Sequence, residues 1–499
     1  MPSSSTAIAE PRAGTATEDP HHARRWLILV IISLAQLMVV LDATVVNIAL
    51  PSAQHALGFS NDARQWVVTA YALAFGSLLL LGGRVADLFG RKYALLIGLA
   101  GFAIASAVGG AANGFEMLVI ARAAQGVFGA LLAPAALSLL TTTFTDLKER
   151  GRAFGIFGAI AGGGAGIGLL LGGVLTEYLN WRWSMYVNII FAAVALVGGF
   201  TLLVHRRSEH RPRLDIPGTI AASAGLFALV YGFSNAETHD WSAPLVWGFL
   251  AAGAVLLTGF VLWQRRAEHP LLPLRVVLDR NRGGSYLAVF LLGIGMFAIF
   301  LFLTYYLQQN LGFSPVSSGL AFLPMIGALM ITATAATSVL LPRFGPKPLI
   351  GLGMLIAGGA MFWLSGIDTT STYASGVLFP LIVAGLGIGL AMAPAMNVAT
   401  AGVDRHDAGV ASATVNTAQQ VGGSIGTALL SSIAANTLSS FTAGKAMTPQ
   451  LMTEAAINSY TTAFSLAGAI FVFGAVVCYL LLKRGVPAQD ENAPAAVHV

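Results

Sequence analysis

The sequence predicts an all-α polytopic membrane protein. Of its 499 residues, 56% are hydrophobic and only 10% are charged, and the mean hydropathy is +0.75. A soluble domain carries about 25% charged residues, so a water-soluble fold is excluded, and the same composition excludes a disordered chain. The single cysteine, Cys478, lies in an apolar run. This excludes a disulfide framework and a metal site built from cysteines.

Fourteen apolar runs are each long enough to cross a bilayer as a helix, which takes about 20 residues. They cover approximately residues 26–49, 66–83, 93–112, 117–141, 153–175, 185–204, 216–235, 243–263, 286–308, 317–341, 349–367, 375–398, 409–433 and 460–482. The polar stretches at residues 1–25 and 485–499 predict disordered tails.

The positive charges predict the orientation of these spans. With the N-terminus in the cytoplasm, 23 of the 27 Lys and Arg residues fall in cytoplasmic segments. Only Arg64, Arg182 and Lys445 fall outside, and Arg122 lies inside a span. This asymmetry follows the positive-inside rule, so both termini are expected in the cytoplasm. The pI of 9.4 then reflects topology, and no nucleic-acid partner is expected.

Short matches that lie eight spans apart indicate an internal repeat. The segment Phe89–Lys92 (FGRK) resembles Phe344–Lys347 (FGPK), and Ala133–Ala135 (APA) recurs as Ala393–Ala395. Two six-helix repeats separated by two inserted helices predict this offset. Internal repeats are typical of secondary transporters, in which the substrate binds between the halves.

The predicted organisation therefore has five parts. They are a cytoplasmic tail (1–25), an N-terminal six-helix bundle (26–204), two inserted helices with a linker (205–285), a C-terminal six-helix bundle (286–482) and a second cytoplasmic tail (483–499).

The loop after the second span resembles the signature of a known family. It reads GRVADLFGRK from Gly83 to Lys92, similar to the G-x-x-x-D-x-x-G-[RK]-[RK] loop of the major facilitator superfamily. The resemblance implies that Gly83, Asp87, Gly90, Arg91 and Lys92 form a latch that holds one conformation of the transport cycle. Asp87 suits the N-terminus of a neighbouring helix. The alternative is a positively charged turn without further role.

Other segments resemble the fourteen-span drug:proton antiporters of the EmrB/QacA type. They are LDATVVNIALP at residues 41–51, RAAQG at 122–126, the WRW of 181–183 followed by Asn188, and the stretch from Tyr306 to Pro324. The likeness covers about residues 26–482. It implies a major facilitator fold of fourteen transmembrane helices, as two six-helix bundles plus two inserted helices. It also implies a monomer in a bacterial-type cell membrane that exchanges a small-molecule substrate for protons without a cofactor.

The fifth span departs from that family at one position. The exporters carry G-x-x-x-G-P-x-x-G-G, whereas Leu169 stands here in place of the proline, so a proline kink is lost. The glycines of this motif remain: Gly158, Gly162, Gly166, Gly168, Gly172 and Gly173. Small residues at such spacing let helices approach closely, so close helix packing alone is an equally good explanation of them.

Two ionisable residues, Asp42 and Arg122, lie well inside the predicted spans. Asp42 is about 12 Å from the outer end of the first span and Arg122 about 9 Å from that of the fourth. An intramembrane charge is costly and marks a functional site by default. We therefore expect a proton-coupling pair, with a static ion pair that fixes helix packing as the alternative.

Softer candidates could line a substrate cavity. Gln36 and Asn47 share a face of the first span, and four residues share a face of the ninth. The full set is Gln36, Asn47, Gln125, Phe302, Tyr305, Tyr306 and Gln309. Helix packing explains each of them equally well. One carboxylate can neutralise a monocation but not a dication in a low dielectric, so neutral or singly charged amphipathic substrates are expected.

These observations favour a proton-coupled exporter of antibiotics, dyes or biocides. An importer or facilitator of the same fold is the alternative, and a membrane enzyme or receptor is the alternative of another class. The sequence carries no H-E-x-x-H motif and no G-x-x-x-x-G-K-[ST] motif, so neither zinc-dependent catalysis nor P-loop ATP hydrolysis is expected.

Asp87→Asn tests the latch assignment. We expect the variant to reach the membrane at a normal level but to transport several-fold more slowly, because the charge that stabilises one conformation is lost. Substrate efflux from cells, normalised to the amount of protein in the membrane, measures the effect. Normal efflux by the variant would make the loop a simple turn.

Overall fold

The computed structural model of the chain is a bundle of long α-helices with no strand among the residues it describes. These are residues 24–144, 147–203, 215–239, 241–268, 270–403, 408–483 and 485. For a few further residues within helices, Asp87, Gly158 and Gly162 among them, the structure describes only the backbone.

Six helices form the first group: α1 (Arg25–Leu57), α2 (Asn61–Phe89), α3 (Arg91–Gly110), α4 (Phe115–Thr143), α5 (Leu147–Tyr178) and α6 (Trp183–Leu202). Two follow: α7 (Ile216–His239) and α8 (Pro244–Gln264). The short α9 (Leu274–Val277) leads to α10 (Arg280–Tyr305), η1 (Tyr306–Asn310), α11 (Pro315–Ala335), η2 (Ala336–Leu340), α12 (Leu341–Phe344), α13 (Pro346–Leu364), η3 (Tyr373–Val377), α14 (Leu378–Thr400), α15 (Ala408–Thr442) and α16 (Pro449–Leu481), where η marks π-helical turns.

Every predicted span falls on a long helix, but not all of these helices are strongly apolar. Among the described residues, twelve helices are long and apolar enough to cross a membrane. The remaining two long helices are α5, with an apolar stretch at Gly166–Tyr178, and α15, which is rich in Gly, Ser and Thr. The described structure therefore gives twelve apolar spans where the sequence predicted fourteen.

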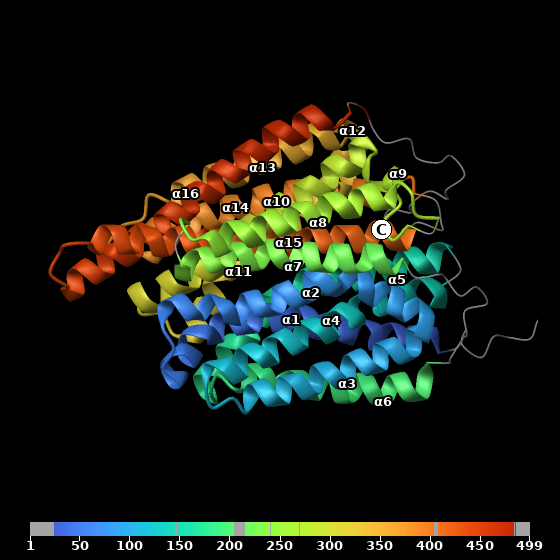
Figure 1. Cartoon of the computed structure of the whole chain (residues 1–499), viewed down its shortest axis with the longest axis horizontal. Coiled ribbons are helices and arrows are strands. Elements are labelled where there is room, and N and C mark those ends of the chain that lie inside the picture. The colour runs from blue at the N-terminus through green and yellow to red at the C-terminus, as the bar shows by residue number, and fades with distance from the viewer. Residues whose placement is uncertain are drawn as a thin grey trace, which may run out of the picture.

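The packing partners within the first group recur in the second. The α4 helix packs on α2, α3 and α1, and α14 packs in the same way on α11, α13 and α10. The α1–α5 and α3–α6 contacts likewise reappear as α10–α15 and α13–α16. In Figure 1 the first group lies in the lower part of the view and most of the second in the upper part, with the start of α1 and the end of α16 at the same right-hand end. We call this end of the helix bundle the terminal end, and the opposite end of the bundle the distal end.

The repeated FGxK segments have the same local geometry. Gly90 lies between α2 and α3 with φ 93°, and Gly345 lies between α12 and α13 with φ 72°. Positive φ values are readily adopted by glycine but strained for other residues. The sequence match therefore marks two equivalent sharp turns at the terminal end.

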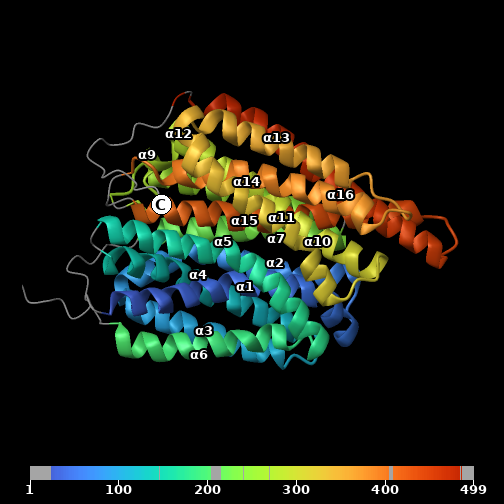
Figure 2. The same ribbon diagram turned by 180° about the vertical axis from the view of Figure 1, so that it is seen from behind.

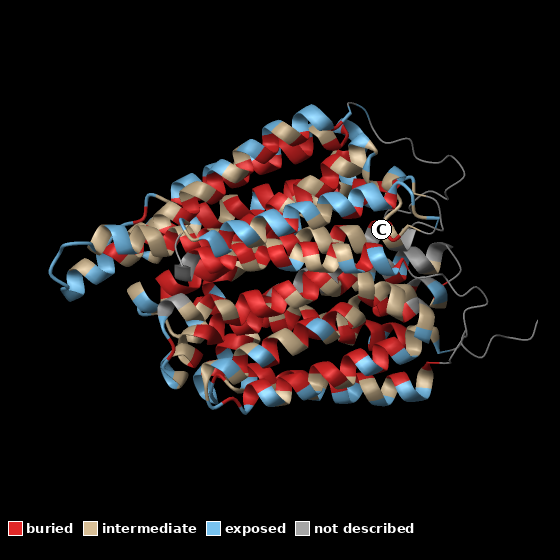
Figure 3. Cartoon of the chain, in the orientation of Figure 1, coloured by how far each residue is buried: buried red, intermediate tan, exposed pale blue. Residues whose placement is uncertain are grey.

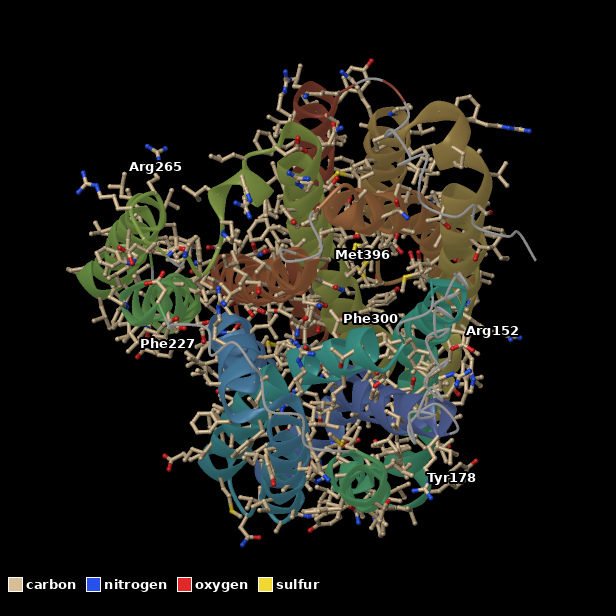
Figure 4. All side chains as sticks on the ribbon, turned by 90° about the vertical axis from the view of Figure 1, so that its right-hand side faces the viewer. Arg152, Tyr178, Phe227, Arg265, Phe300 and Met396 are labelled. Atoms are coloured by element: carbon tan, nitrogen blue, oxygen red, sulfur yellow. The ribbon has the colours of Figure 1, made fainter. Side chains whose placement is uncertain are left out.

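The α7–α8 pair lies at the side of the two groups. Figure 4, seen from the terminal end, places Phe227 of α7 and Arg265 at this edge. Asp215 ties the pair together by accepting hydrogen bonds from Trp263 Nε1 (2.7 Å) and Gln264 Nε2 (2.5 Å). Burial raises the pKa of Asp215, but these bonds and that from the Gly218 amide outweigh it and hold the pKa below its ordinary value.

Among the described residues, the apolar core is continuous between the two groups at the distal end. One cluster joins residues of α10–α16 to distal residues of the first group, such as Val46, Leu50, Val68 and Leu169. A second cluster holds only α1–α6 residues nearer the terminal end, such as Ile32 and Phe144. Figure 3 shows that exposed residues lie mainly on the outward faces of the helices. The two groups thus share an apolar core at the distal end and have separate cores toward the terminal end.

The described glycines of α5 form two faces with different partners, and Figure 2 shows α5 running between α1 and α11. A Cβ at Gly172 would lie 2.9 Å from Val45 Cα of α1, and a Cβ at Gly173 would lie 2.8 Å from Val316 Cα of α11. From the opposite side, a Cβ at Gly319 would meet the Leu169 carbonyl oxygen at 2.6 Å. Glycine therefore permits close contact both within the first group and between the groups.

Gly172→Val tests this packing. The added side chain would meet the backbone of α1, which cannot rotate away, so we expect a loss of about 1–3 kcal/mol and a clearly lower thermal midpoint in detergent. Gly259→Val in α8 is the matched control, because no atom lies within 4 Å of a Cβ there. An equal effect of both variants would contradict close α1–α5 packing.

Candidate functional site

Asp42 of α1 and Arg122 of α4 form an ion pair inside the first group. Arg122 Nη1 donates to Asp42 Oδ2, and the two side chains are 1% and 0% exposed, Arg122 first. The sequence placed Asp42 and Arg122 at similar depths in their spans, and in the fold α1 packs beside α4. Both charges are therefore buried together, away from solvent.

The second oxygen of Asp42 is bound by two amides. Asp42 Oδ1 accepts from Gln125 Nε2 at 2.9 Å and from Asn188 Nδ2 of α6 at 2.7 Å. Gln125 also accepts from Arg122 Nη1 at 2.9 Å and donates to Ser106 Oγ of α3 at 2.8 Å. Both the oxygen and the nitrogen of the Gln125 amide thus have hydrogen-bond partners, and these fix the orientation of the amide. Helices α1, α4 and α6 thus meet at the carboxylate, and α3 joins them through the bond from Gln125 to Ser106.

Arg122 also holds α2. Its Nε donates to the Val67 carbonyl oxygen at 3.0 Å, and its guanidinium carbon lies 4.4 Å from the centre of the Tyr71 ring. Cation–π contacts of this kind are strengthened when the groups are desolvated. The guanidinium therefore links α1 to α2 as well as neutralising Asp42.

Two buried oxygens of the site have no hydrogen-bond partner among the described residues. They are the hydroxyl of Tyr71, beside Arg122, and Oδ1 of Asn188, beside Asp42. A buried polar atom without a partner carries a free-energy cost. These two atoms are the ones the site can offer to a water molecule or a polar group of a substrate.

Three residues of this network were not among the predicted site residues. Asn188 lies in the segment that resembles the antiporters, so its signal was present but carried no assigned role. Ser106 and Tyr71 lie in apolar runs without any distinguishing pattern. Of the cavity candidates, Gln125 belongs to the network, whereas the Asn47 amide donates within its own helix to the Ala43 carbonyl at 3.0 Å. Gln36 is half-buried on α1.

The four candidates of the ninth span have different surroundings. Phe302 packs on Tyr460 and Phe464 of α16, and the Tyr306 hydroxyl donates to the Ser371 carbonyl at 3.2 Å, so both point into the second group. Tyr305 instead faces Arg64 of α2 at 3.4 Å. Gln309 is exposed. The π-helical turn at Tyr306–Asn310 begins after Tyr305, so it shifts Gln309 relative to the other three but does not separate Phe302 from Tyr305.

The predicted latch loop lies at the terminal end. Lys92 Nζ donates to the carbonyl oxygens of Phe200 (3.1 Å) and Leu203, which end α6, a common role of lysine at a helix C-terminus. A Cβ at Gly83 would lie 3.6 Å from Pro134 Cβ. Gly90 makes the turn described above, and Arg91 begins α3. The side chain of Asp87 lies outside the described residues, so its expected partner stays a prediction.

No group of three or more His, Cys, Asp or Glu residues that could hold a metal ion occurs in the part of the chain that the structure describes.

The sequence pattern of the Major Facilitator Superfamily matches residues 32–427. The chain belongs to this superfamily. It is 48% identical over 494 residues to the puromycin resistance protein pur8 of Streptomyces alboniger, covering 99% of this chain and 97% of that protein. It is 38% identical over 409 residues to the cephamycin export protein CmcT of Amycolatopsis lactamdurans, covering 81% and 83%. It is 34% identical over 487 residues to the lincomycin resistance protein of Streptomyces lincolnensis, covering 96% and 97%.

Solved structures agree with the fold. A bacterial homologue of the human lysosomal transporter Spinster, in an inward-facing and unoccupied conformation, superposes with a TM-score of 0.64 at 17% identity, covering 93% of this chain and 97% of that one. A D-xylose–proton symporter gives a TM-score of 0.63 at 17% identity, covering 92% and 98%. Membership of the superfamily, together with relatives named for resistance and export, identifies the chain as a multi-pass membrane transport protein and not an enzyme, as the sequence predicted.

Arg122→Leu tests the energetics of the pair. Removing one partner of a buried ion pair leaves an uncompensated charge and costs about 3–5 kcal/mol, so we expect a much lower thermal midpoint. The double variant Asp42→Asn/Arg122→Leu removes both charges and should recover most of that loss. If the double variant is no more stable than Arg122→Leu, Asp42 and Arg122 do not interact as the structure has them.

Proposed function

We propose that the protein exports amphipathic small-molecule antibiotics in exchange for protons by alternating access. The observation that carries the proposal is the buried Asp42–Arg122 pair, because a carboxylate in a dry site is the group whose charge a proton can cancel. Proteins named for puromycin, cephamycin and lincomycin resistance or export align over most of the chain, which supports export of antibiotics rather than import.

The proposed topology has fourteen spans, with α5 and α15 as membrane helices despite their glycine and hydroxyl content. Both helices pack against strongly apolar neighbours, α1 and α10 respectively, so little of their polar surface needs to face lipid. Two six-helix bundles at 26–204 and 286–482, with the inserted helices and linker at 205–285, follow from the repeated packing pattern. The positive-inside rule places the terminal end and both tails in the cytoplasm.

In this topology the structure is closed toward the outside, because the shared core lies at the distal end. The ionised Asp42 paired with Arg122 then belongs to the inward-facing state. We propose that the empty, ionised site does not interconvert between the two states, whereas binding of either substrate or a proton allows it. Each proton that enters draws about 2.3 kcal/mol per 100 mV from the membrane potential.

A single carboxylate limits the substrate class. One negative charge can balance one positive charge in a low-dielectric cavity, but a second positive charge would be buried unpaired. We therefore propose neutral or singly charged amphipathic compounds as substrates. The two polar atoms beside the pair, the Tyr71 hydroxyl and Asn188 Oδ1, are the proposed contacts for a hydroxyl or amine of the substrate.

We also propose a role for α5 in the movement between the two states, and helix packing supports this role. Without a proline at Leu169, the movement between states depends on the glycine faces of α5, of which Gly173 contacts α11 of the other bundle. Sliding of two backbones in direct contact requires that no side chain blocks them.

Asp42→Asn tests proton coupling. The variant keeps the hydrogen bonds of a protonated carboxyl but cannot titrate, so we expect uphill, pH-gradient-driven transport of puromycin in proteoliposomes to be abolished, while downhill exchange persists. Asp368→Asn is the matched control, because this carboxylate is exposed in a loop at the distal end and should transport normally. Full uphill transport by Asp42→Asn would move the coupling site elsewhere, and puromycin uptake down its own gradient without proton movement would favour a facilitator.

A further inference from the structure

Gln308, Glu177 and Arg64 each make a side-chain contact between the two bundles at the distal end. Gln308 Nε2 donates to the Ile48 carbonyl oxygen at 3.1 Å, and Glu177 Oε2 accepts from the Val316 amide at 3.0 Å. In the third contact, the guanidinium carbon of Arg64 in α2 lies 3.4 Å from the centre of the Tyr305 ring in α10. Neither proton coupling nor substrate binding, as proposed above, uses any of these contacts.

The third contact is the most fully enclosed of them. Arg64 is half-buried, and it also forms a hydrogen bond with the side chain of Tyr460 in α16. The two tyrosines are 1% and 3% exposed. A guanidinium held over an aromatic ring away from water interacts more strongly than the same pair at a surface. We call Arg64, Tyr305 and Tyr460 the distal clasp.

The distal clasp is connected to the ion pair through one face of α2. Residues three and seven positions apart lie on the same side of a helix, so Arg64, Val67 and Tyr71 form a single row. The other two members of the row, the Val67 carbonyl and the Tyr71 ring, are the groups of α2 that Arg122 contacts. Arg64 lies only about 4.5 Å further along the axis than Val67. One helical face is thus held by Arg122 from its own bundle and by two tyrosines of the other.

We propose that Arg64 is a gating residue, and that α2 makes closure of the distal clasp depend on the charge of the Asp42–Arg122 pair. While Asp42 is ionised, it fixes the guanidinium of Arg122 between α1 and α2, and this holds Arg64 over Tyr305. When Asp42 is neutral, Arg122 is released from α1, the row on α2 shifts and the clasp opens. The empty, ionised carrier is thereby kept closed, which prevents protons or substrate from leaking without exchange.

Arg64 and Tyr305 are positioning residues in this scheme, so Tyr305 serves the gate and not the substrate cavity. That the charge of Asp42 controls the clasp rests on the proposed proton coupling. That the clasp holds the two bundles closed does not. A cysteine-labelling assay without substrate or pH gradient separates the two.

The assay uses Ile326→Cys in a Cys478→Ala background. Ile326 is 8% exposed in α11 and faces Gly166 of the other bundle, 3.4 Å from the position of a Cβ there. A membrane-impermeant maleimide applied from the distal side can react with a cysteine at this position only when the distal clasp is open. We expect Arg64→Ala to raise the labelling rate roughly 3- to 30-fold, the change that loss of such a contact gives. Tyr305→Leu, which keeps the apolar bulk, should act in the same direction.

Arg182→Ala is the matched control. This arginine is also at the distal end and lies over an aromatic ring, Trp181 at 4.7 Å, but it donates to the Gly110 and Ala112 carbonyls within its own bundle. Its loss should leave labelling of the thiol introduced by Ile326→Cys unchanged. Arg64→Lys should keep the labelling rate close to that of the wild type, because an ammonium also binds a ring face. Wild-type labelling in both Arg64→Ala and Tyr305→Leu would overturn the clasp.

Combining Arg64→Ala with Asp42→Asn tests the link through α2. Asp42→Asn alone should raise labelling, and in the Arg64→Ala background it should add little, because both changes open the same contact. Fully additive effects, or no effect of Asp42→Asn on labelling, would overturn the link. Failure of proton coupling would instead appear in the proteoliposome assay, with the labelling results unaffected.

Discussion

Burial of the Arg122 guanidinium is the constraint on which the N-terminal bundle depends. A charged group in the apolar interior is tolerated only when its charge is paired and its donors are bonded. Asp42 supplies the charge, and the Val67 carbonyl, the Gln125 amide and the Tyr71 ring supply the remaining contacts. To bring these groups together, α1, α2 and α4 must pack in one register, and Asn188 and Ser106 extend the same requirement to α6 and α3.

The interface between the bundles follows a different rule. There the contacts are made by backbone and small residues, with Gly173 against Val316 and Gly319 against Leu169, together with the few side chains of the distal end. Such surfaces can separate and re-form without breaking the ion pair, because they hold none of its groups. Under the proposed function, the charged network keeps one bundle intact while the glycine-rich contact between the bundles changes.

The second bundle repeats the helix packing of the first without a buried ion pair like Asp42–Arg122 among its described residues. Its helices pack in the same order as those of the first, but apolar side chains fill its interior, with Phe300 and Phe302 packed against Phe322 and Phe464. The same helix arrangement is therefore stabilised by charge pairing in one half and by aromatic packing in the other. Under the proposed function, this asymmetry leaves Asp42 of the first bundle to respond to protons.

The sequence by itself determined where the helices lie, that the chain crosses a membrane, and that Asp42 and Arg122 are buried at similar depth. Length, hydropathy and depth are properties of a segment and its position along the helix axis, so local composition is sufficient. Only the tertiary structure decided which way each helix faces. That Asn188 binds Asp42, that the α5 glycines divide between α1 and α11, and that Tyr305 lies against Arg64 while Tyr306 binds the Ser371 carbonyl all depend on rotation about the helix axis. In these helices most faces are apolar, so no polar stripe in the sequence marks the buried side, and the π-helical turn after Tyr305 shifts the register without a signal in the residues themselves.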